Sequence, residues 1–431
     1  MYHILYFPTR YFPAISGAEF YLQSIAEIMN SKYNYTVDVY TSTAIDFRGL
    51  RHADGKIINP ENKNYDRINN LKITRYPINY HVDIDEKLHK IKNLSFYETL
   101  QLSDKCLTEF LKNGPYLDSL IENIKLPTNN SFDLVHTTFF PYFNLLITLM
   151  LGKILNKPTV CTPFFHFSNP RYHNKYLVEA LNKFDTIIAC TNLEKNVLTE
   201  KLGISESKIK VISMGVNFKK FSQSSEQINH KFRFKRKYFK PNEVDYKMVL
   251  FCGYKNYEKG AISILKAIPS ILRTFPKVYF VFIGPSTIAF NRELSNLRNI
   301  ISARIINFTP DNLNGYYDPK KIAAFRETDI FLMPSRSDAY GIAYLEAWAS
   351  GKPVIGANIG ATPEVVRNNI DGLLVEFNNY EDIASKVVTL LKNERFSNDM
   401  GQEGKRKVQK SLSWYDVAKK THQLYRELIH K

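Results

Sequence analysis

Two carboxylates, Asp338 and Glu346, stand eight positions apart in the stretch from Pro334 to Val366. The chemistry open to them is acceptance of hydrogen bonds, either from a ligand or from the protein itself. Glu346 lies among uncharged residues, and a buried carboxylate without a partner costs several kcal/mol. Glu346 therefore needs a partner, and an internal ion pair or a solvated edge would supply one without any ligand. Asp338 could equally serve as a helix N-cap, a role worth ~1 kcal/mol.

The residues around this pair predict the elements that position it. Ile330 to Met333 is a short apolar run typical of a strand, Pro334 to Asp338 is typical of a turn, and Gly341 to Ser350 is apolar enough for a buried helix. Gly351 follows as a helix-ending glycine, and Val354 begins another buried strand. We therefore expect a strand–helix–strand unit whose turn lies at the carboxyl edge of a parallel sheet.

The turn before this predicted helix is a candidate site for an anion such as phosphate. Free backbone N–H groups and the helix dipole favour negative charge at a helix start. Gly341 lets a ligand approach the backbone because it has no Cβ atom. Its neighbours Tyr340 and Ile342 belong to the same candidate site.

Two other predicted helix starts have the same character. Gly17 follows a first strand from Tyr2 to Phe7 and precedes an apolar helical pattern, although an ordinary strand-to-helix turn has this pattern too. Lys259 stands just before a helix that begins at Ala261, where its ammonium group can neutralise a diphosphate as a point charge.

His166 is a candidate of another kind, because it follows a predicted strand from Thr159 to Phe164. A side chain at the carboxyl end of a parallel strand lies where ligands bind. A histidine there can donate a hydrogen bond to a hydroxyl or a phosphate. A lone histidine is more often structural, so both interpretations stay open at this point.

The pattern that begins at Asp338 has two acids with seven residues between them, then a glycine, a proline and a glycine turn of small residues. It resembles the signature of retaining glycosyltransferases of family four. The resemblance implies that Glu346 binds the ribose hydroxyls of a nucleotide and that Asp338 lies near the donor sugar as a catalytic residue. Asp338 replaces the usual glutamate of the family. The segment CTPFFHFSNP resembles the family segment whose histidine contacts the donor sugar or diphosphate, which implies a catalytic role for His166.

The glycine loops add two partial matches to the same family. The family has Gly-Arg, four residues and then Lys-Gly; Lys259 matches the lysine, while Tyr254 stands at the arginine position. Lys255 is a candidate for supplying the missing charge. Near the first strand the family has a pair of small residues that lets the loop approach the donor diphosphate or the acceptor. The pair here is Ser16-Gly17, so Gly17 joins the predicted donor site.

Alternating strands and helices in both halves of the chain predict the α/β fold class. The resemblance implies two Rossmann-like domains facing each other across a cleft, the GT-B arrangement. We predict an acceptor-side domain over residues 1–215, a basic linker over 216–245 and a domain that binds the nucleotide-sugar donor over 246–411. A C-terminal helix within 412–431 is expected to pack back on the first domain.

Composition narrows the class of protein. The 431 residues are 44% hydrophobic, which allows two real cores and excludes a disordered chain. A formal net charge of +16 indicates attraction to anionic membranes, nucleic acid or phosphorylated ligands without choosing among them. Four widely spaced cysteines are typical of small buried residues in a reducing cytosol. No secretory signal is recognised, and the longest apolar run is shorter than the ~20 residues of a spanning helix.

One basic segment, Lys231 to Lys240, combines six basic residues with four aromatic ones. This mixture suits an anionic membrane surface or single-stranded nucleic acid. It is equally typical of an interdomain segment whose aromatic side chains pack on the core. No recognised nucleic-acid module surrounds it, so no nucleic-acid partner is predicted. We expect a cytoplasmic protein, with peripheral binding at the inner membrane face as an open alternative.

The predicted activity is transfer of a sugar, with retention, from a nucleotide-diphosphate sugar to a lipid-linked, glycan or small-molecule acceptor. Lys259 and the helix start at Gly341 would stabilise the leaving diphosphate, so no metal and no cofactor beyond the donor is expected. The Asp-x-Asp pattern at Asp83 and Asp85 is too short, and too far from any strand, to predict a metal site. The alternatives are a GT-B-like epimerase or phosphorylase, or a non-catalytic basic protein that binds membranes or nucleic acid.

Overall fold

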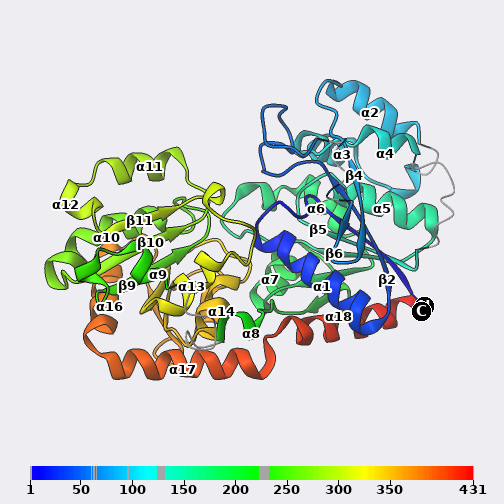
Figure 1. The fold of residues 1–431 in the computed structure, drawn as a ribbon. Coiled ribbons are helices and arrows are strands. Elements are labelled where there is room, and N and C mark those ends of the chain that lie inside the picture. The colour runs from blue at the N-terminus through cyan, green and yellow to red at the C-terminus, as the bar shows by residue number, and fades with distance from the viewer. Residues whose placement is uncertain are drawn as a thin grey trace. The chain divides into compact units, whose positions relative to one another are not determined.

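The protein is described by a computed structural model that covers residues 2–59, 61, 64, 66–94, 97–123, 132–222 and 233–430. The chain divides into two compact units. Unit 1 comprises Met1–Ser213 together with Tyr415–Lys431, and unit 2 comprises Met214–Trp414. Figure 1 shows a layered arrangement of strands and helices in each of them.

Unit 1 is built on an eight-stranded sheet in the order β3-β4-β2-β1-β5-β6-β7-β8. Seven strands pair in parallel, and only the short edge strand β3 is antiparallel to its neighbour. Helices cover the sheet, so the central strands β1, β2 and β5 are buried along almost their whole length. The strands are β1 (His3–Pro8), β2 (Thr36–Ser42), β3 (Arg67–Ile68), β4 (Leu71–Tyr76), β5 (Leu134–Thr138), β6 (Thr159–Thr162), β7 (Thr186–Ala189) and β8 (Ile209–Val211).

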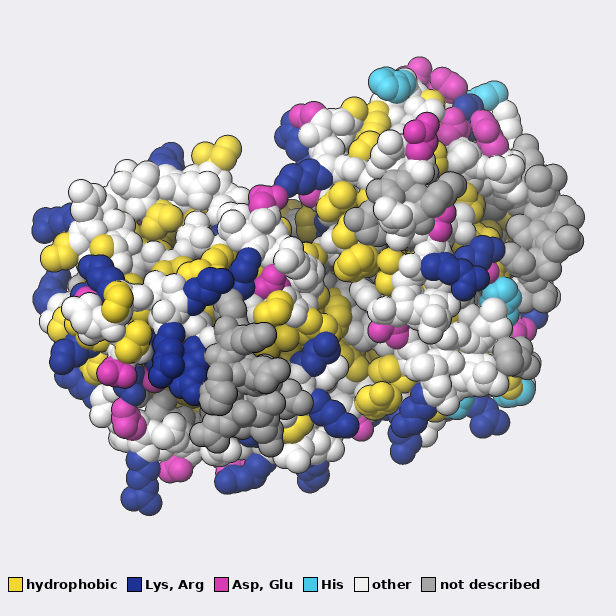
Figure 2. Space-filling model, in the orientation of Figure 1, with side chains coloured by type: hydrophobic (Ala, Val, Ile, Leu, Met, Phe, Trp, Pro, Cys, Tyr) yellow, Lys and Arg dark blue, Asp and Glu magenta, His cyan; other side chains and the backbone are white. Residues whose placement is uncertain are grey.

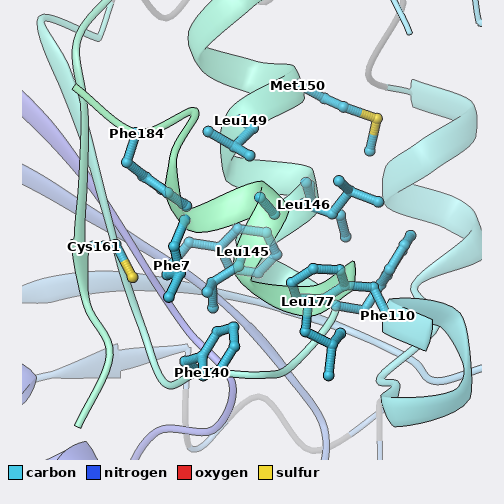
Figure 3. Packing of buried hydrophobic residues seen from close by; sticks show 14 of the residues in the cluster. Phe7, Phe110, Phe140, Leu145, Leu146, Leu149, Met150, Cys161, Leu177 and Phe184 are labelled. Atoms are coloured by element: carbon cyan, nitrogen blue, oxygen red, sulfur yellow. The ribbon is translucent and has the colours of Figure 1, made fainter. Parts of the chain in front are cut away.

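The main core of unit 1 lies between the sheet and the helices around α5. Figure 3 shows Leu145, Leu146, Leu149 and Met150 of α5 packed near Phe7 of β1, and all of these side chains belong to one buried cluster. The longest apolar run of the sequence is thus part of the turn into α5 and of α5 itself. The helices of unit 1 are α1 (Gly17–Tyr33), α2 (Ile84–Lys92), α3 (Asp104–Asn113), α4 (Asp118–Asn123), α5 (Asn144–Leu155), α6 (Lys175–Leu181), α7 (Asn192–Asn196) and α18 (Trp414–Ile429).

Helix α18 joins unit 1 through a buried polar network. The hydroxyl of Tyr425 lies within hydrogen-bond distance of His136 Nδ1 and of the hydroxyl of Tyr6. Burial lowers the pKa of His136 to about 3, so the ring is neutral. One ring nitrogen then donates and the other accepts, toward the hydroxyls of Tyr425 and Thr162. His422 adds a second contact, with Nδ1 2.8 Å from the Tyr35 hydroxyl.

Unit 2 is built on a six-stranded sheet in the order β11-β10-β9-β12-β13-β14, with every pair parallel. Its first strand, β9, therefore lies in the middle, and the chain turns to opposite sides of β9 as it proceeds. This is the strand order of dinucleotide-binding folds. The strands are β9 (Lys247–Cys252), β10 (Val278–Ile283), β11 (Ile305–Phe308), β12 (Ile330–Met333), β13 (Val354–Ala357) and β14 (Gly372–Val375).

The helices of unit 2 confirm the predicted strand–helix–strand unit. Helix α14 follows β12, ends one residue before the predicted Ser350, and is succeeded by Gly351 at φ 72°. The helices are α8 (Phe218–Ser222), α9 (Phe234–Tyr238), α10 (Ala261–Thr274), α11 (Ile288–Ser295), α12 (Asn299–Ser302), α13 (Pro319–Glu327), α14 (Ile342–Ala349), α15 (Thr362–Val365), α16 (Tyr380–Lys392) and α17 (Glu394–Ser411).

Two sequence predictions differ from the structure in detail. Strand β6 ends at Thr162 rather than at Phe164, because Pro163 cannot donate a ladder hydrogen bond and Phe164 has φ 53°. Part of the predicted linker is a structured element of unit 2. Phe234 of α9 is fully buried, and Glu327 of α13 accepts its backbone N–H at 2.6 Å.

The basic segment at 231–240 is described from residue 233 onward, and Lys231 lies outside the described residues. Phe234 and Phe239 are buried, and Lys235 forms an ion pair with Asp329 at 3.0 Å. These contacts support the interpretation in which the aromatic side chains pack on the core. On the face shown in Figure 2, Lys and Arg side chains form separate groups and no continuous basic surface.

Among the residues the structure describes, no helix is long and apolar enough to cross a membrane. The four cysteines are all free thiols, and Cys106, Cys161 and Cys190 are buried as the sequence predicts.

Candidate functional site

The candidate site of unit 2 lies at the carboxyl end of β9 and β12. In this sheet β10 lies on one side of β9 and β12 on the other, so the strand order reverses at β9. Ligands bind at such a switch point in open α/β sheets. The loop after β9 carries Lys259 and leads into α10, while the loop after β12 carries Asp338 and leads into α14. Two distant parts of the sequence are thereby brought to one place.

Lys259 and Asp338 form an ion pair across these two loops. Lys259 Nζ lies 2.7 Å from Asp338 Oδ1, and the side chains are 17% and 15% exposed. Lys259 Nζ also donates to the carbonyl oxygen of Ser337 at 3.3 Å. The other carboxylate oxygen, Asp338 Oδ2, is buried and accepts no hydrogen bond from the described residues. A buried acceptor without a donor is costly, so Asp338 is ready to accept a hydrogen bond from a ligand.

A second ion pair ties the same loops together. Arg336 donates from Nε and Nη2 to the two carboxylate oxygens of Glu258, at 2.8 and 2.6 Å. The backbone N–H of Arg336 also donates to the carbonyl oxygen of Glu258 at 3.0 Å. Gly260 completes the contact, because its φ is 75° and a Cβ there would lie 2.4 Å from the carbonyl oxygen of Pro334. The two loops are therefore held as one platform under the Lys259–Asp338 pair.

Both helices at this edge begin without a side-chain cap. Gly260 precedes α10, Gly341 precedes α14, and neither start has a capping side-chain hydrogen bond. Gly341 has φ 91° and takes the N-cap position, so Asp338 is not the cap of α14. Tyr340 and Ile342 are each 8% exposed, so their side chains are buried. An anion would therefore bind mainly to the backbone N–H groups of these residues.

Glu346 is buried in α14, as its neighbours predict, and its partner is internal. Glu346 Oε1 accepts from Lys321 Nζ of α13 at 2.8 Å, and their side chains are 2% and 7% exposed. Lys321 Nζ also lies 3.6 Å from the centre of the Tyr316 ring. The internal ion pair left open by the sequence is thus present.

Lys255 faces a different place from the one expected of a phosphate-binding group. Its ammonium is buried, donates to the carbonyl oxygen of Phe308 at 2.9 Å and lies 2.5 Å from Asn307 Oδ1. Burial lowers the pKa of Lys255 to about 8. Tyr254, at the position of the family arginine, is 45% exposed. The structure therefore does not bring Lys255 to the Lys259–Asp338 pair.

Unit 1 contains the other two predicted site residues. Gly17 is the first residue of α1, one position into the helix that it was predicted to precede, and the nearby buried pair of Arg10 and Glu19 joins at 2.8 Å. His166 follows β6 and is partly exposed, with ring contacts to Phe139 and Tyr172.

The turn that carries His166 is held by a buried acid. Glu194 is fully buried and accepts the backbone N–H of Phe165 at 2.9 Å and that of Cys190 at 2.7 Å. Elsewhere, Asp83 is the N-cap of α2, and no group of three or more potential metal ligands occurs among the described residues.

Sequence reasoning missed Lys321, Arg336, Glu258 and Glu194. Arg336 could have been found, because it stands two residues before Asp338 in the same turn. Lys321 gave no local signal, since it lies 25 positions from Glu346 in an otherwise ordinary helix.

Comparison with known proteins identifies the family. Residues 233–407 match the family model of Glycosyl transferases group 1, and residues 102–220 match that of Glycosyltransferase Family 4. The chain is 29% identical over 259 residues to an uncharacterized glycosyltransferase of Methanocaldococcus jannaschii, covering 60% of this chain and 63% of that protein. It is 27% identical over 260 residues to a D-inositol 3-phosphate glycosyltransferase of Corynebacterium jeikeium, covering 58% and 59%.

The fold is shared with solved structures of the same type. The Anabaena protein HepE, crystallised with UDP and glucose, superposes with a TM-score of 0.71 at 15% sequence identity, covering 99% of both chains. The fold is therefore the GT-B type. The chain belongs to the glycosyl transferases group 1 family. The alignments span about three fifths of the two curated relatives named above.

Proposed function

We propose that this protein is a retaining glycosyltransferase that moves a sugar from a nucleotide-diphosphate sugar to an acceptor hydroxyl in the cytoplasm. The observation that carries the proposal is Asp338, whose Oδ1 is held by Lys259 while Oδ2 stays buried and without a donor. A sugar hydroxyl supplies the hydrogen bond that this oxygen lacks. Family membership and the UDP bound to HepE support a nucleotide donor.

The platform at β9 and β12 has the charges that the departing group needs. When the bond between the anomeric carbon and the diphosphate oxygen breaks, negative charge develops on that oxygen. Lys259 and the uncapped starts of α10 and α14 are positioned to stabilise this charge. The acceptor hydroxyl forms the new bond on the face that the diphosphate leaves, and its proton passes to the departing phosphate oxygen. No metal is needed for this charge balance.

Binding of the donor would change the contacts that Lys259 and Asp338 make with each other. In the free protein Lys259 pairs with Asp338 at 2.7 Å. With the donor bound, Lys259 shares its donors with the diphosphate, and Asp338 turns to the donor sugar. His166 on unit 1 is proposed to contact the sugar or diphosphate, Gly17 to allow close approach of its loop, and Glu346 to bind the ribose.

A donor panel tests this function. Hydrolysis and transfer are measured with UDP-, GDP- and ADP-sugars, with and without a chelator, for the wild type and for Asp338→Asn. We expect turnover of one donor class that survives the chelator and falls about ten- to hundredfold in the variant. Failure of the wild type to turn over any donor, or full activity of Asp338→Asn, would contradict the proposal. Activity abolished by the chelator would contradict its metal-independent form.

A further inference from the structure

The Lys321–Glu346 pair is the most deeply buried ion pair near the candidate site. Lys321 comes from α13 and Glu346 from α14, and both side chains are almost fully enclosed. The pair lies near the end of β9, close enough to Cys252 for both charges to affect the pKa of its thiol. Burial raises this pKa to about 12, the charge of Lys321 opposes the rise and the charge of Glu346 adds to it.

Tyr316 borders the same cluster. The centre of its ring lies 3.6 Å from Lys321 Nζ, within the range of a cation–π contact. Burial raises the pKa of Tyr316 well above its usual value, and the charge of Glu346 is the next cause. Tyr316 and Cys252 are partly exposed while Lys321 and Glu346 are not, so the cluster reaches the surface through these two neighbours.

Such a pair is a poor way to gain stability. Desolvation of two charges often exceeds their attraction, and replacement by well-packed apolar residues is often neutral or stabilising. Removal of one partner alone is costly, because it leaves an uncompensated buried charge. Replacing Lys321 is therefore expected to affect Glu346 more than the packing of α13. The other buried residues of α13 are Ala323, Ala324 and Phe325.

We propose that Lys321 is a positioning residue for nucleotide recognition. It holds Glu346 in one orientation through Oε1, so that the side chain can accept hydrogen bonds from the ribose hydroxyls of the donor. Lys321 itself does not touch the nucleotide. This inference rests on the proposed function, and it assigns the preference for ribose over deoxyribose to the pair and not to Glu346 alone.

Calorimetric titration with nucleotides that differ only in the ribose tests this role. UDP, GDP and ADP are compared with their 2′,3′-dideoxy analogues on the full chain. We expect the wild type to bind the ribonucleotide of its preferred base about ten- to hundredfold more tightly, as for hydrogen bonds to a charged group. Lys321→Met should lose most of this preference, while Lys321→Arg should keep it. Lys320→Met, on the neighbouring residue of α13, is the matched control and should also keep it.

A purely structural lysine gives a different result. In that case Lys321→Met weakens both nucleotides by the same factor and leaves the ribose preference unchanged, which would overturn the inference. Should Lys321→Met fail to fold, the doubly neutral variant Lys321→Met with Glu346→Gln removes the unpaired charge. That variant should fold and show no ribose preference, and a retained preference would overturn the inference. If the wild type binds none of the nucleotides, the proposed function falls, and this inference falls with it.

Discussion

The two units share a strand order at their centre but use it differently. In unit 1 the first strand, β1, lies between β2 and β5, and in unit 2 the first strand, β9, lies between β10 and β12. Each has a cation paired with an acid close to the carboxyl end of that strand. In unit 1, Arg10 pairs with Glu19 of the helix that follows, and in unit 2, Lys259 pairs with Asp338 from a different loop.

The surroundings of these two pairs separate a structural role from a ligand-binding one. Arg10 and Glu19 are 4% and 5% exposed, and Arg10 also donates to the Ile45 carbonyl oxygen and stacks on Phe47. Lys259 and Asp338 are three to four times more exposed. Each pair keeps one buried polar atom without a hydrogen-bond partner among the described residues, the donor nitrogen Arg10 Nη2 in unit 1 and the acceptor oxygen Asp338 Oδ2 in unit 2. The same sheet topology therefore holds a deeply buried pair in unit 1 and a more exposed pair in unit 2.

The largest effect is expected from breaking the deeply buried pair, Arg10 and Glu19. Arg10→Met leaves the buried Glu19 without its cation, so the free energy of unfolding should fall by about 3–5 kcal/mol. Chemical denaturation followed by circular dichroism measures this change. Nucleotide affinity of the folded fraction should stay within about twofold of the wild type. A stability loss below about 1 kcal/mol together with a large loss of affinity would show that unit 1 carries the anion site.

Breaking the more exposed pair, Lys259 and Asp338, should act on the reaction instead. Asp338→Asn removes a charged acceptor worth about 1.5–3 kcal/mol, so kcat/KM should fall about ten- to hundredfold. Affinity for the nucleoside diphosphate alone should be kept or improved, because Lys259 is released from its partner. Asp338→Glu keeps the carboxylate and is the matched control. Equal weakening of nucleotide and sugar-nucleotide binding would place Asp338 at the phosphates and not at the sugar.

Lys255 of unit 2 should make the free energy of unfolding depend on pH. Its pKa is about 8 in the folded protein against 10.5 for a free lysine, so between these values the unfolded chain binds more protons. The free energy of unfolding should therefore rise as the pH increases from 8 to 10.5, by at most about 1.4 kcal/mol per unit. Lys255→Met should make this rise smaller than in the wild type, whereas Lys266→Met, on the exposed face of α10, should leave it. A rise of the same size in Lys255→Met and in the wild type would contradict the assignment.

The smallest effect is expected from the second cross-loop pair. Glu258 and Arg336 are 38% and 32% exposed, and pairs of this kind contribute less than about 1 kcal/mol. Glu258→Gln should therefore weaken nucleotide binding by no more than about fivefold in a calorimetric titration. A loss greater than that of Asp338→Asn in donor turnover would mean that Arg336 contacts the donor directly.

Much of the local structure around the site could be predicted from sequence, because its signals are local. The apolar run Ile330 to Met333, the turn after it and Gly351 fix β12 and α14 to within one residue. The burial of Glu346 followed from its apolar neighbours in the same way. The role of Gly341 in letting a ligand approach the backbone stays a prediction, while its φ of 91°, which side chains rarely adopt, accounts for a glycine at this position.

The partners of these residues could not be predicted, because they come from distant parts of the chain. Lys321 reaches Glu346 from α13, and Lys259 reaches Asp338 from a loop 79 positions earlier. Lys255 was expected near the phosphates, but its backbone forms a bridge with Ser286 in another loop. The strand order brings these two loops together, and the local sequence does not show it. The resemblance to the family assigned a role to each residue separately. The sheet topology determines which of these residues are in contact.

The central claim is that unit 2 binds the donor through the Lys259–Asp338 site. Calorimetric titration of the preferred nucleoside diphosphate into Lys259→Met tests it most directly, with Lys266→Met as the control in the following helix. We predict that Lys259→Met binds about ten- to hundredfold more weakly than the wild type, since a charge-assisted contact to the diphosphate is lost. Lys266→Met should bind as the wild type does. Undiminished binding by a folded Lys259→Met protein would contradict the account.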